Sequence, residues 1–233
     1  MKIKDSIAFV TGANRGLGLA LVHELLARGA SKVYAGVRDP ASFNLPGVVA
    51  VKLDVTNADE VAAAAAQCSD VTLLINNAGI AKVFSYLEPT AIDTGREIFE
   101  ANFFGTIRMS QAFTPVLAKN KGGAIVNILS VASWVNSPEL SLYGASKAAA
   151  WAFTNGLRTS LRAQGTQVTG LHVGFMDTDM THGFDLPKVS PQEVAVLTLA
   201  GLEAGLEEVL ADDITRTVKQ GLSTGIYLAP LQR

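Results

Sequence analysis

The sequence has 233 residues, of which 48% are hydrophobic and only 17% are charged, against a usual charged share of about 25%, so its composition excludes a disordered chain and favours a large buried core. Its formal net charge is -2, with 19 Lys and Arg against 21 Asp and Glu, which leaves no overall positive field to attract nucleic acid or an anionic membrane.

The cysteine content and the N-terminus bear on the compartment. Cys68 is the single cysteine, so it cannot form an intrachain disulfide, and we expect it to pack as a small apolar residue. Residues 1–5 lack the apolar run of a secretion signal, and no apolar run approaches the roughly 20 residues that span a bilayer. Three histidines and one cysteine are too few for a zinc site. We therefore predict a cytoplasmic protein without a metal.

Apolar segments of strand length alternate along the chain with longer helical patterns, and no Pro/Ser-rich linker interrupts them. This alternation is typical of βαβ units, and hence of an α/β fold whose parallel sheet is covered on both faces. The predicted strands are residues 6–11, 32–37, 48–52, 71–76, 124–129 and 168–173, with an edge strand near 226–228. The predicted helices are residues 17–28, 58–67, 92–119, 143–164 and 191–204, with a short helix after residue 212. Pro115 is expected to kink the longest of them.

A glycine-rich turn follows the first predicted strand and reads Thr-Gly-Ala-Asn-Arg-Gly-Leu-Gly at positions 11–18. Glycines at a junction of strand and helix let the backbone approach a pyrophosphate, whose charge then lies at the helix N-terminus. A turn that binds no ligand is the alternative for the glycines alone.

Three polar residues follow the fifth strand. Ser130 comes directly after it, and Tyr143 and Lys147 lie at positions i and i+4 of the next helix, where they share one face and can meet the same ligand. A phenol has a pKa near 10, and an ammonium about 6 Å away would favour its ionised form by roughly 3 kcal/mol at an effective dielectric of about 20. We therefore expect Tyr143 to have a lowered pKa and to exchange a proton with a carbonyl or alcohol oxygen. Taken singly, Ser130 could be an ordinary loop serine, and Tyr143 and Lys147 could be a solvent-exposed pair on a helix.

Together these motifs resemble those of the short-chain dehydrogenase/reductase family. The turn at 11–18 matches T-G-x-x-x-G-x-G, residues 76–79 read Asn-Asn-Ala-Gly, and the Tyr–Lys pair matches Y-x-x-x-K. The matches follow the family's order as far as Thr178. The resemblance implies a single dinucleotide-binding domain over residues 1–233, with a Rossmann-like doubly wound parallel sheet of about seven strands and helices on both faces.

The resemblance also implies roles for individual residues. Tyr143 would be the general acid or base, and the Ser130 hydroxyl would hold the same substrate oxygen as a neutral donor. Lys147 would grip the nicotinamide ribose, and Asn102 would fix a water in a proton relay. The cofactor-binding residues that it implies are Gly12, Asn14, Arg15, Gly16, Leu17, Gly18, Arg38, Asp54, Val55, Asn77, Ala78, Gly79, Tyr143, Lys147, Gly174 and Thr178.

One segment departs from the family's pattern. After the sixth strand the family usually has Pro-Gly and then a threonine, whereas here Val173 precedes Gly174. Thr178 keeps its spacing and can still hydrogen-bond the carboxamide, behind a less rigid turn. Asp54 occupies the position that contacts the adenine amino group, and a cap at the end of a strand is its alternative.

The choice of cofactor should depend on the end of the second strand, where an acid would bind the ribose diol and a cation would accept a 2′-phosphate. Val37 stands where the acid would be. Arg38 follows it and Arg15 lies in the glycine turn, so two guanidinium groups could converge on a phosphate. We expect NADP(H), with NAD(H) less favoured. The alternative is two surface arginines, with Asp39 pairing Arg38.

Substrate contacts are expected from the loops at the carboxyl ends of the strands, mainly residues 80–90, 131–142 and 174–190. Their candidate lining is apolar and aromatic, although core packing is the alternative for the aromatic residues. The segment between Thr178 and Ser190 is short, which predicts an open site. The candidate lining residues are Ile80, Ala81, Phe84, Val131, Trp134, Leu140, Phe175, Met176, His182 and Phe184. His23, His172 and His182 have no partner in the sequence that suggests catalysis.

The sequence thus predicts an NADP-dependent oxidoreductase that reduces an aldehyde or ketone, or oxidises the matching alcohol. An enoyl reductase is disfavoured, because those relatives separate the Tyr and Lys by a longer interval. A cofactor-sensing binding protein of the same fold is the alternative from another class, and the complete catalytic set argues against it. The resemblance further implies a homodimer or homotetramer that pairs through helices 92–119 and 143–164.

Overall fold

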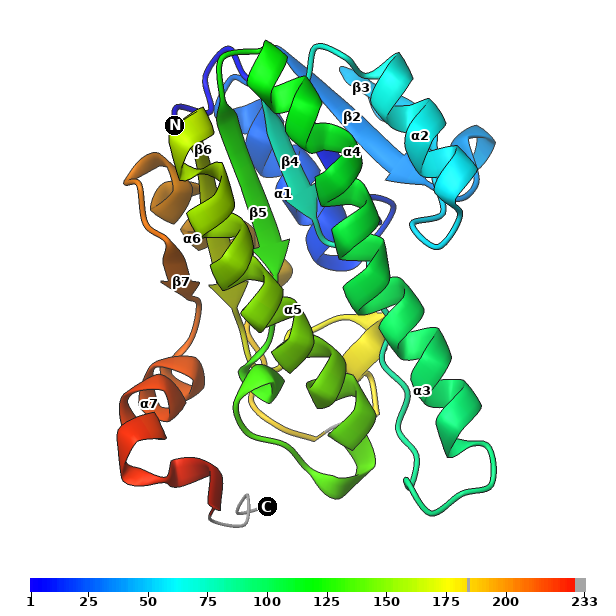
Figure 1. Ribbon diagram of the computed structural model, residues 1–233, viewed down its shortest axis with the longest axis vertical. Coiled ribbons are helices and arrows are strands. Elements are labelled where there is room, and N and C mark those ends of the chain that lie inside the picture. The colour runs from blue at the N-terminus through cyan, green and yellow to red at the C-terminus, as the bar shows by residue number, and fades with distance from the viewer. Residues whose placement is uncertain (184, 229–233) are drawn as a thin grey trace.

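The computed structural model describes residues 1–183 and 185–228. Its centre is a parallel sheet in the order β3-β2-β1-β4-β5-β6-β7 (Figure 1), which confirms the predicted doubly wound α/β fold. The strands are β1 (Ile7–Thr11), β2 (Lys32–Val37), β3 (Val48–Lys52), β4 (Leu73–Asn76), β5 (Gly123–Ile128), β6 (Thr166–His172) and β7 (Glu208–Leu210).

Helices cover both faces of this sheet. Figure 1 shows α4 and α5 in front of the strands and α1 behind them, and α1 packs against α6 on that far face. The helices are α1 (Gly16–Ala27), α2 (Ala58–Gln67), α3 (Ala91–Phe99), α4 (Gly105–Lys119), α5 (Ser141–Leu161), α6 (Pro191–Glu203) and α7 (Asp213–Gly221). None of the helices in the described part of the chain has both the length and the hydropathy that a membrane span requires.

Each face of the sheet carries its own apolar core, because successive residues of a strand point to opposite faces. In β1, Val10 packs into the core beneath α1 and α6. Its neighbour Phe9 packs into the core beneath α2, α4 and α5, where its ring lies 5.0 Å from that of Phe113. All of these side chains are fully buried, which explains why the central strands appear in the sequence as continuous apolar runs.

The longest predicted helix is divided into three parts. It comprises α3, a π-helical segment over Glu100–Phe104 and α4, and the Gly105 N–H bonds to the Glu100 carbonyl in the i→i+5 pattern of that segment. Pro115 lies inside α4, which nevertheless continues to Lys119.

The predicted edge strand near residues 226–228 is wrong, because these residues form a 3-10 helix. The seventh strand is β7, which pairs in parallel with β6 from Gly170 opposite Glu208. With three residues, β7 is too short for an alternating pattern to reveal it.

The topology determines where a ligand can bind. The chain runs outward from β1 to β3 and then returns to β4 on the other side of β1. Since all the paired strands are parallel, the loops after β1, β4, β5 and β6 meet at one edge, and the reversal at β1 and β4 leaves a crevice between them.

Candidate active site

A cleft of about 2730 Å³ lies at the carboxyl ends of the strands. Its lining includes every cofactor-binding residue predicted from the sequence, together with Ser130, Tyr143 and Lys147. Residues from all three predicted substrate loops also line it. The sheet thus brings together side chains that lie far apart in the chain.

The glycine turn after β1 has the geometry that an anion requires. Gly12 and Gly16 have φ of +63° and +53°, which is a left-handed conformation that favours glycine. At Gly18 a Cβ atom would lie only 2.1 Å from the Gly12 carbonyl oxygen, so the turn closes on itself. Arg15, the N-cap of α1, makes no side-chain capping bond, and the first turn carries no acidic residue. The free N–H groups and the helix dipole therefore suit a pyrophosphate.

The Asn-Asn-Ala-Gly segment after β4 holds this turn in place. The Thr11 hydroxyl oxygen accepts from the backbone N–H groups of Asn77 and Ala78, both at 2.9 Å. The Asn77 amide donates to the carbonyl oxygens of Thr11 and Gly12 at 2.9 and 3.1 Å. These four bonds join the loops on either side of the crevice.

The predicted catalytic pair lies on α5, beside the end of β5. The Lys147 Nζ atom is 5.9 Å from the centre of the Tyr143 ring, close to the spacing expected from the sequence, and donates to the Ile128 carbonyl at 2.8 Å. Ser130 is the N-cap of the 3-10 turn Val131–Ser133, and its hydroxyl oxygen accepts from the Ala132 N–H at 3.1 Å. The Ser130 hydroxyl and the Tyr143 phenol are hydrogen-bonded to each other, and both residues line the cleft.

The expected direction of the Tyr143 pKa is wrong. Burial raises the pKa of Tyr143 above its ordinary value, and the hydrogen bond with Ser130 offsets this only in part. The reason is that an apolar wall disfavours the phenolate, whereas the expectation from the sequence counted only the nearby ammonium. The phenol is therefore protonated at neutral pH, which is the state that a general acid needs.

Burial also affects the lysine. Lys147 is 6% exposed, and desolvation lowers its pKa from its ordinary 10.5 to about 8. A buried ammonium destabilises the fold wherever the folded protein still binds the proton. This penalty is fully present below pH 8 and is relieved as the pH rises from about 8 to 10.5, because the unfolded chain then holds a proton that the folded protein has released.

We expect Lys147→Met to stabilise the ligand-free protein at pH 7. The lowered pKa corresponds to a charging penalty on the order of 3 kcal/mol, and losing the bond to Ile128 offsets about 1 kcal/mol of that gain. The net gain of about 1 to 2 kcal/mol should raise the Tm by roughly 2 to 8 °C. Thermal melts at pH 7 and pH 10 measure this, and the difference between variant and parent should shrink at the higher pH. An unchanged or lower Tm at pH 7 would contradict the assigned penalty.

Asn102 lies in the π-helical segment and does not line the cleft. It is 1% exposed and forms reciprocal bonds with the backbone of Ile80, accepting at 2.8 Å and donating at 2.9 Å. Its amide also donates to the Ser146 hydroxyl at 3.0 Å, and that hydroxyl donates to the Tyr143 carbonyl at 2.6 Å. Asn102 therefore connects the loop after β4 to the catalytic helix from behind the wall of the cleft.

The residues predicted to select the cofactor lie at the far end of the cleft. Val37 is buried and Arg38 is exposed, and no hydrogen bond or ion pair joins the Arg38 side chain to another described residue. Asp39 does not pair with it but accepts from the Ala41 N–H as the cap of a 3-10 turn. Arg15 forms an ion pair with Asp179 at 2.9 Å, so the glycine turn contacts the segment after β6.

Asp54 has the local geometry of a cap. Its carboxylate accepts from the backbone N–H and the hydroxyl of Thr56 at 2.9 and 2.8 Å. These bonds hold the pKa of Asp54 below its ordinary value, and the bond from the Thr56 backbone has the largest effect. The cap leaves Asp54 and Val55 in the lining of the cleft, where contact with an adenine remains a prediction.

An aspartate that sequence reasoning missed supports the turn after β6. The Gly174 N–H donates to the Asp212 carboxylate at 2.6 Å, and this carboxylate also caps α7 through Thr215 at 2.8 Å. A Cβ on Gly16 would lie 3.4 Å from the Thr178 methyl group, which places Thr178 beside the glycine turn. The Asp-x-x-Thr spacing at 212–215 predicts a helix cap but not its second partner.

The substrate end of the cleft is partly as expected. Ile80, Ala81, Val131, Leu140, Phe175 and Met176 line it, whereas Phe84, Trp134 and His182 are not among its described lining residues. Trp134 instead stacks on His172 with ring centres 3.9 Å apart, which is the packing alternative for an aromatic residue. The predicted lining residue Phe184 lies outside the described residues.

Comparisons with known proteins agree with this geometry. The short chain dehydrogenase family model matches residues 6–187. An uncharacterised oxidoreductase of Staphylococcus epidermidis is 32% identical over 207 residues, which are 83% of this chain and 89% of that protein. An uncharacterised oxidoreductase of Staphylococcus aureus is 30% identical over 213 residues, which are 86% and 92% of the two chains.

Solved structures extend the likeness to the whole fold. A short chain dehydrogenase from Burkholderia cenocepacia, solved in complex with NADP, is 42% identical, with a TM-score of 0.92 over 97% of this chain and 95% of that one. A relative from Burkholderia phymatum, solved in complex with NAD, shares the fold at 24% identity, with a TM-score of 0.86 over 100% of both chains. The chain thus belongs to the short-chain dehydrogenase/reductase family of oxidoreductases, which use a nicotinamide cofactor.

Proposed function

We propose that this protein, as one domain over residues 1–233, is an NADP-dependent oxidoreductase that reduces an aldehyde or ketone to an alcohol, or catalyses the reverse reaction. The observation that carries the proposal is the convergence of Ser130, Tyr143 and Lys147 on one cleft with the glycine turn. The apolar lining at this end of the cleft supports an apolar or aromatic substrate.

The side chains divide the work on the substrate oxygen. The Tyr143 phenol donates its proton to the carbonyl oxygen and takes it back in the reverse direction. Ser130 donates a hydrogen bond to the same oxygen where negative charge develops. Lys147 holds the nicotinamide ribose, and Asn102 holds the Ile80 loop against α5 through Ser146. The nicotinamide, when bound, supplies or accepts the hydride.

Three observations support NADP over NAD as the cofactor. The relative from Burkholderia cenocepacia was solved in complex with NADP. Buried Val37 offers no carboxylate to the ribose hydroxyls, and Arg38 lies at the cleft without an ion-pair partner among the described residues. Arg15 lies at the same cleft but is held by Asp179, so a 2′-phosphate must draw it away from that carboxylate.

The loss of NADPH absorbance, recorded against a panel of aldehydes and ketones, tests the proposed activity. We expect turnover with apolar or aromatic carbonyl compounds, and none when the substrate is left out. The protein could instead bind NADPH but turn over none of the carbonyl compounds, and none of the matching alcohols with NADP. That result would contradict the proposed enzymatic activity and favour the cofactor-sensing alternative.

We expect the protein to be a dimer or tetramer in solution. Ile92 is 67% exposed and Phe104 43% exposed, and both line a shallow apolar groove with Phe99 and Leu142. This groove lies on α3, the π-helical segment and α5, the helices through which the resemblance implies pairing, and exposed apolar patches of this kind are typical of interfaces. Light scattering at micromolar concentration measures the mass. The mass of a 24.5 kDa monomer would contradict the prediction, and Phe104→Arg should shift the protein toward that mass.

A further inference from the structure

His172, at the end of β6, is a buried titratable residue that the proposed reaction does not use. Its side chain is 0% exposed and does not line the cleft. One face of the ring stacks on Trp134 with ring centres 3.9 Å apart and planes 18° apart. An imidazole that is shielded in this way cannot act on a substrate directly, so its role must be sought in what its nitrogens contact.

The Nδ1 atom of His172 lies 3.2 Å from the carbonyl oxygen of Ser130. A carbonyl oxygen can only accept, so Nδ1 carries the proton and donates. Burial lowers the pKa of His172 to about 4, which keeps the ring neutral at physiological pH with its single proton on this nitrogen. The histidine thus makes a hydrogen bond to the main chain of the residue whose hydroxyl faces the substrate.

The Ser130 carbonyl oxygen makes a second hydrogen bond, within the 3-10 turn that follows Ser130. It also accepts from the Ser133 N–H at 3.0 Å, while the Ser130 hydroxyl oxygen accepts from the Ala132 N–H. The next residue, Val131, donates its N–H to the Val173 carbonyl at 3.0 Å. Three hydrogen bonds thus hold the peptide between Ser130 and Val131, and His172 supplies one of them from the neighbouring strand.

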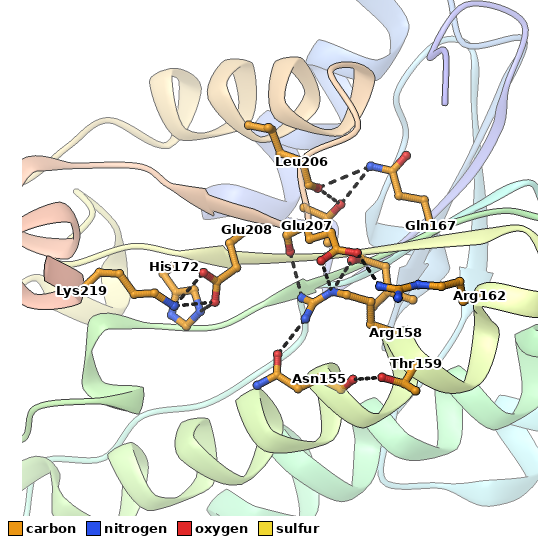
Figure 2. Close-up of polar contacts among 12 residues, drawn as sticks. Asn155, Arg158, Thr159, Arg162, Gln167, His172, Leu206, Glu207, Glu208 and Lys219 are labelled. Atoms are coloured by element: carbon orange, nitrogen blue, oxygen red, sulfur yellow. Dashed lines mark hydrogen bonds and ion pairs between the residues drawn. The ribbon is translucent and has the colours of Figure 1, made fainter. Parts of the chain in front are cut away.

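The second edge of the imidazole faces an ion pair on the outer strand. Figure 2 shows His172 beside Glu208 of β7 and Lys219 of α7, and the His172 Nε2 atom is 3.8 Å from the Glu208 carboxylate. Lys219 holds both oxygens of that carboxylate at 2.9 and 2.7 Å, and its Nζ lies 5.0 Å from the centre of the Trp134 ring. Glu208 and Lys219 thus contact the stacked His172 and Trp134 rings on their outer side.

We propose that His172 is a positioning residue that holds Ser130 in its productive orientation through the Nδ1–H bond to the Ser130 carbonyl. This inference rests on the proposed function, in which the Ser130 hydroxyl holds the substrate oxygen. The Trp134 ring and the Glu208–Lys219 pair keep the imidazole in place, so they support the histidine without touching the substrate.

Two substitutions separate the hydrogen bond from the packing. His172→Phe keeps a flat ring against Trp134 but removes the donor, and His172→Asn loses the ring but keeps an N–H donor at nearly the position of Nδ1. We expect His172→Phe to lower kcat about 3- to 10-fold, the effect of one lost hydrogen bond, with the KM for NADPH unchanged. His172→Asn should keep kcat within about twofold of the parent.

A double-mutant cycle with Ser130→Ala tests whether the histidine acts through the serine. In the Ser130→Ala protein there is no hydroxyl left to orient, so adding His172→Phe should change the residual kcat by less than about twofold. An equal loss in both backgrounds, or an unchanged kcat in the single His172→Phe variant, would overturn the inference. Circular dichroism of each variant confirms that the proteins compared are folded.

Two controls keep this test distinct from that of the proposed function. Arg162→Met removes an exposed ion pair with Glu207 beside β7, at 3.1 Å (Figure 2), and should leave kcat unchanged because it does not reach His172. Ser130→Ala alone should lower kcat by about 10²- to 10³-fold. A fully active Ser130→Ala variant would overturn the proposed role of the serine itself. If Ser130→Ala is inactive and His172→Phe is fully active, only the positioning role of His172 is overturned.

Discussion

Replacing Tyr143 with phenylalanine is expected to lower turnover about 10²- to 10⁴-fold while leaving the affinity for NADPH nearly intact. In the proposed reaction the Tyr143 side chain reaches the substrate oxygen through its hydroxyl group. The ring without this hydroxyl would keep its place on α5. Steady-state rates with a carbonyl substrate, and NADPH binding measured by fluorescence, provide the two readouts.

Tyr34→Phe is a matched control, because it removes a phenol hydroxyl that bonds Asp70 at 2.9 Å on β2, outside the cleft. It should leave the rate unchanged. A Tyr143→Phe variant that kept more than about a tenth of the rate would show that another group delivers the proton.

The raised pKa of Tyr143 also predicts how the two directions respond to pH. Reduction needs the protonated phenol, which is present throughout the neutral range, so its rate should be flat near pH 7. Oxidation needs the phenolate, so its rate should increase as the pH rises toward the raised pKa. Initial rates between pH 6 and pH 10 in both directions measure this, and an oxidation rate that is already at its plateau at pH 7 would contradict the raised pKa.

Replacing Arg38 with leucine is expected to raise the KM for NADPH about 10- to 150-fold and to leave the KM for NADH nearly unchanged. A 2′-phosphate carries about two negative charges, and one charge-assisted hydrogen bond to it contributes about 1.5 to 3 kcal/mol. NADH has no such phosphate, so it loses nothing. Steady-state titration of both cofactors measures the two constants.

Val37→Asp should act in the opposite sense, since its carboxylate would accept from the ribose hydroxyls and repel the phosphate. Arg162→Leu is a matched control, because Arg162 is exposed, pairs with Glu207 and lies outside the main cleft. Equal weakening of both cofactors by Arg38→Leu, or use of NADH by the parent as readily as NADPH, would identify Arg38 and Arg15 as ordinary surface charges.

The sequence predicted most of the fold and much of the candidate site, because both depend on local patterns. Continuous apolar runs revealed the six long strands, and the glycine turn and the Tyr–Lys spacing identified side chains that the sheet brings to one cleft. Where the prediction relied on a single neighbour it was wrong: the pKa of Tyr143 depends on how much of the protein surrounds the phenol, and the spacing to Lys147 does not reveal this.

Contacts between distant segments could not be predicted for the same reason. Asp212 supports Gly174, and Asp179 pairs with Arg15, yet each of these aspartates alone predicts only a helix cap or a solvated charge. His172 has no partner within its own strand, and its bond to Ser130 exists only because β5 and β6 are neighbours. Such pairs follow from the order of strands in the sheet rather than from motifs.

The π-helical segment at Glu100–Phe104 makes the length of the chain there a functional constraint. Each residue of an α-helix turns the chain by about 100°, so deleting one residue from this segment would rotate α3 and α4 against each other by about that angle. Asn102 could then face Ile80 and Ser146 only if Met109 and Phe113 of α4 left the core in which they are fully buried. An alignment gap placed in this segment therefore marks a relative in which the loop after β4 must be joined to α5 in another way.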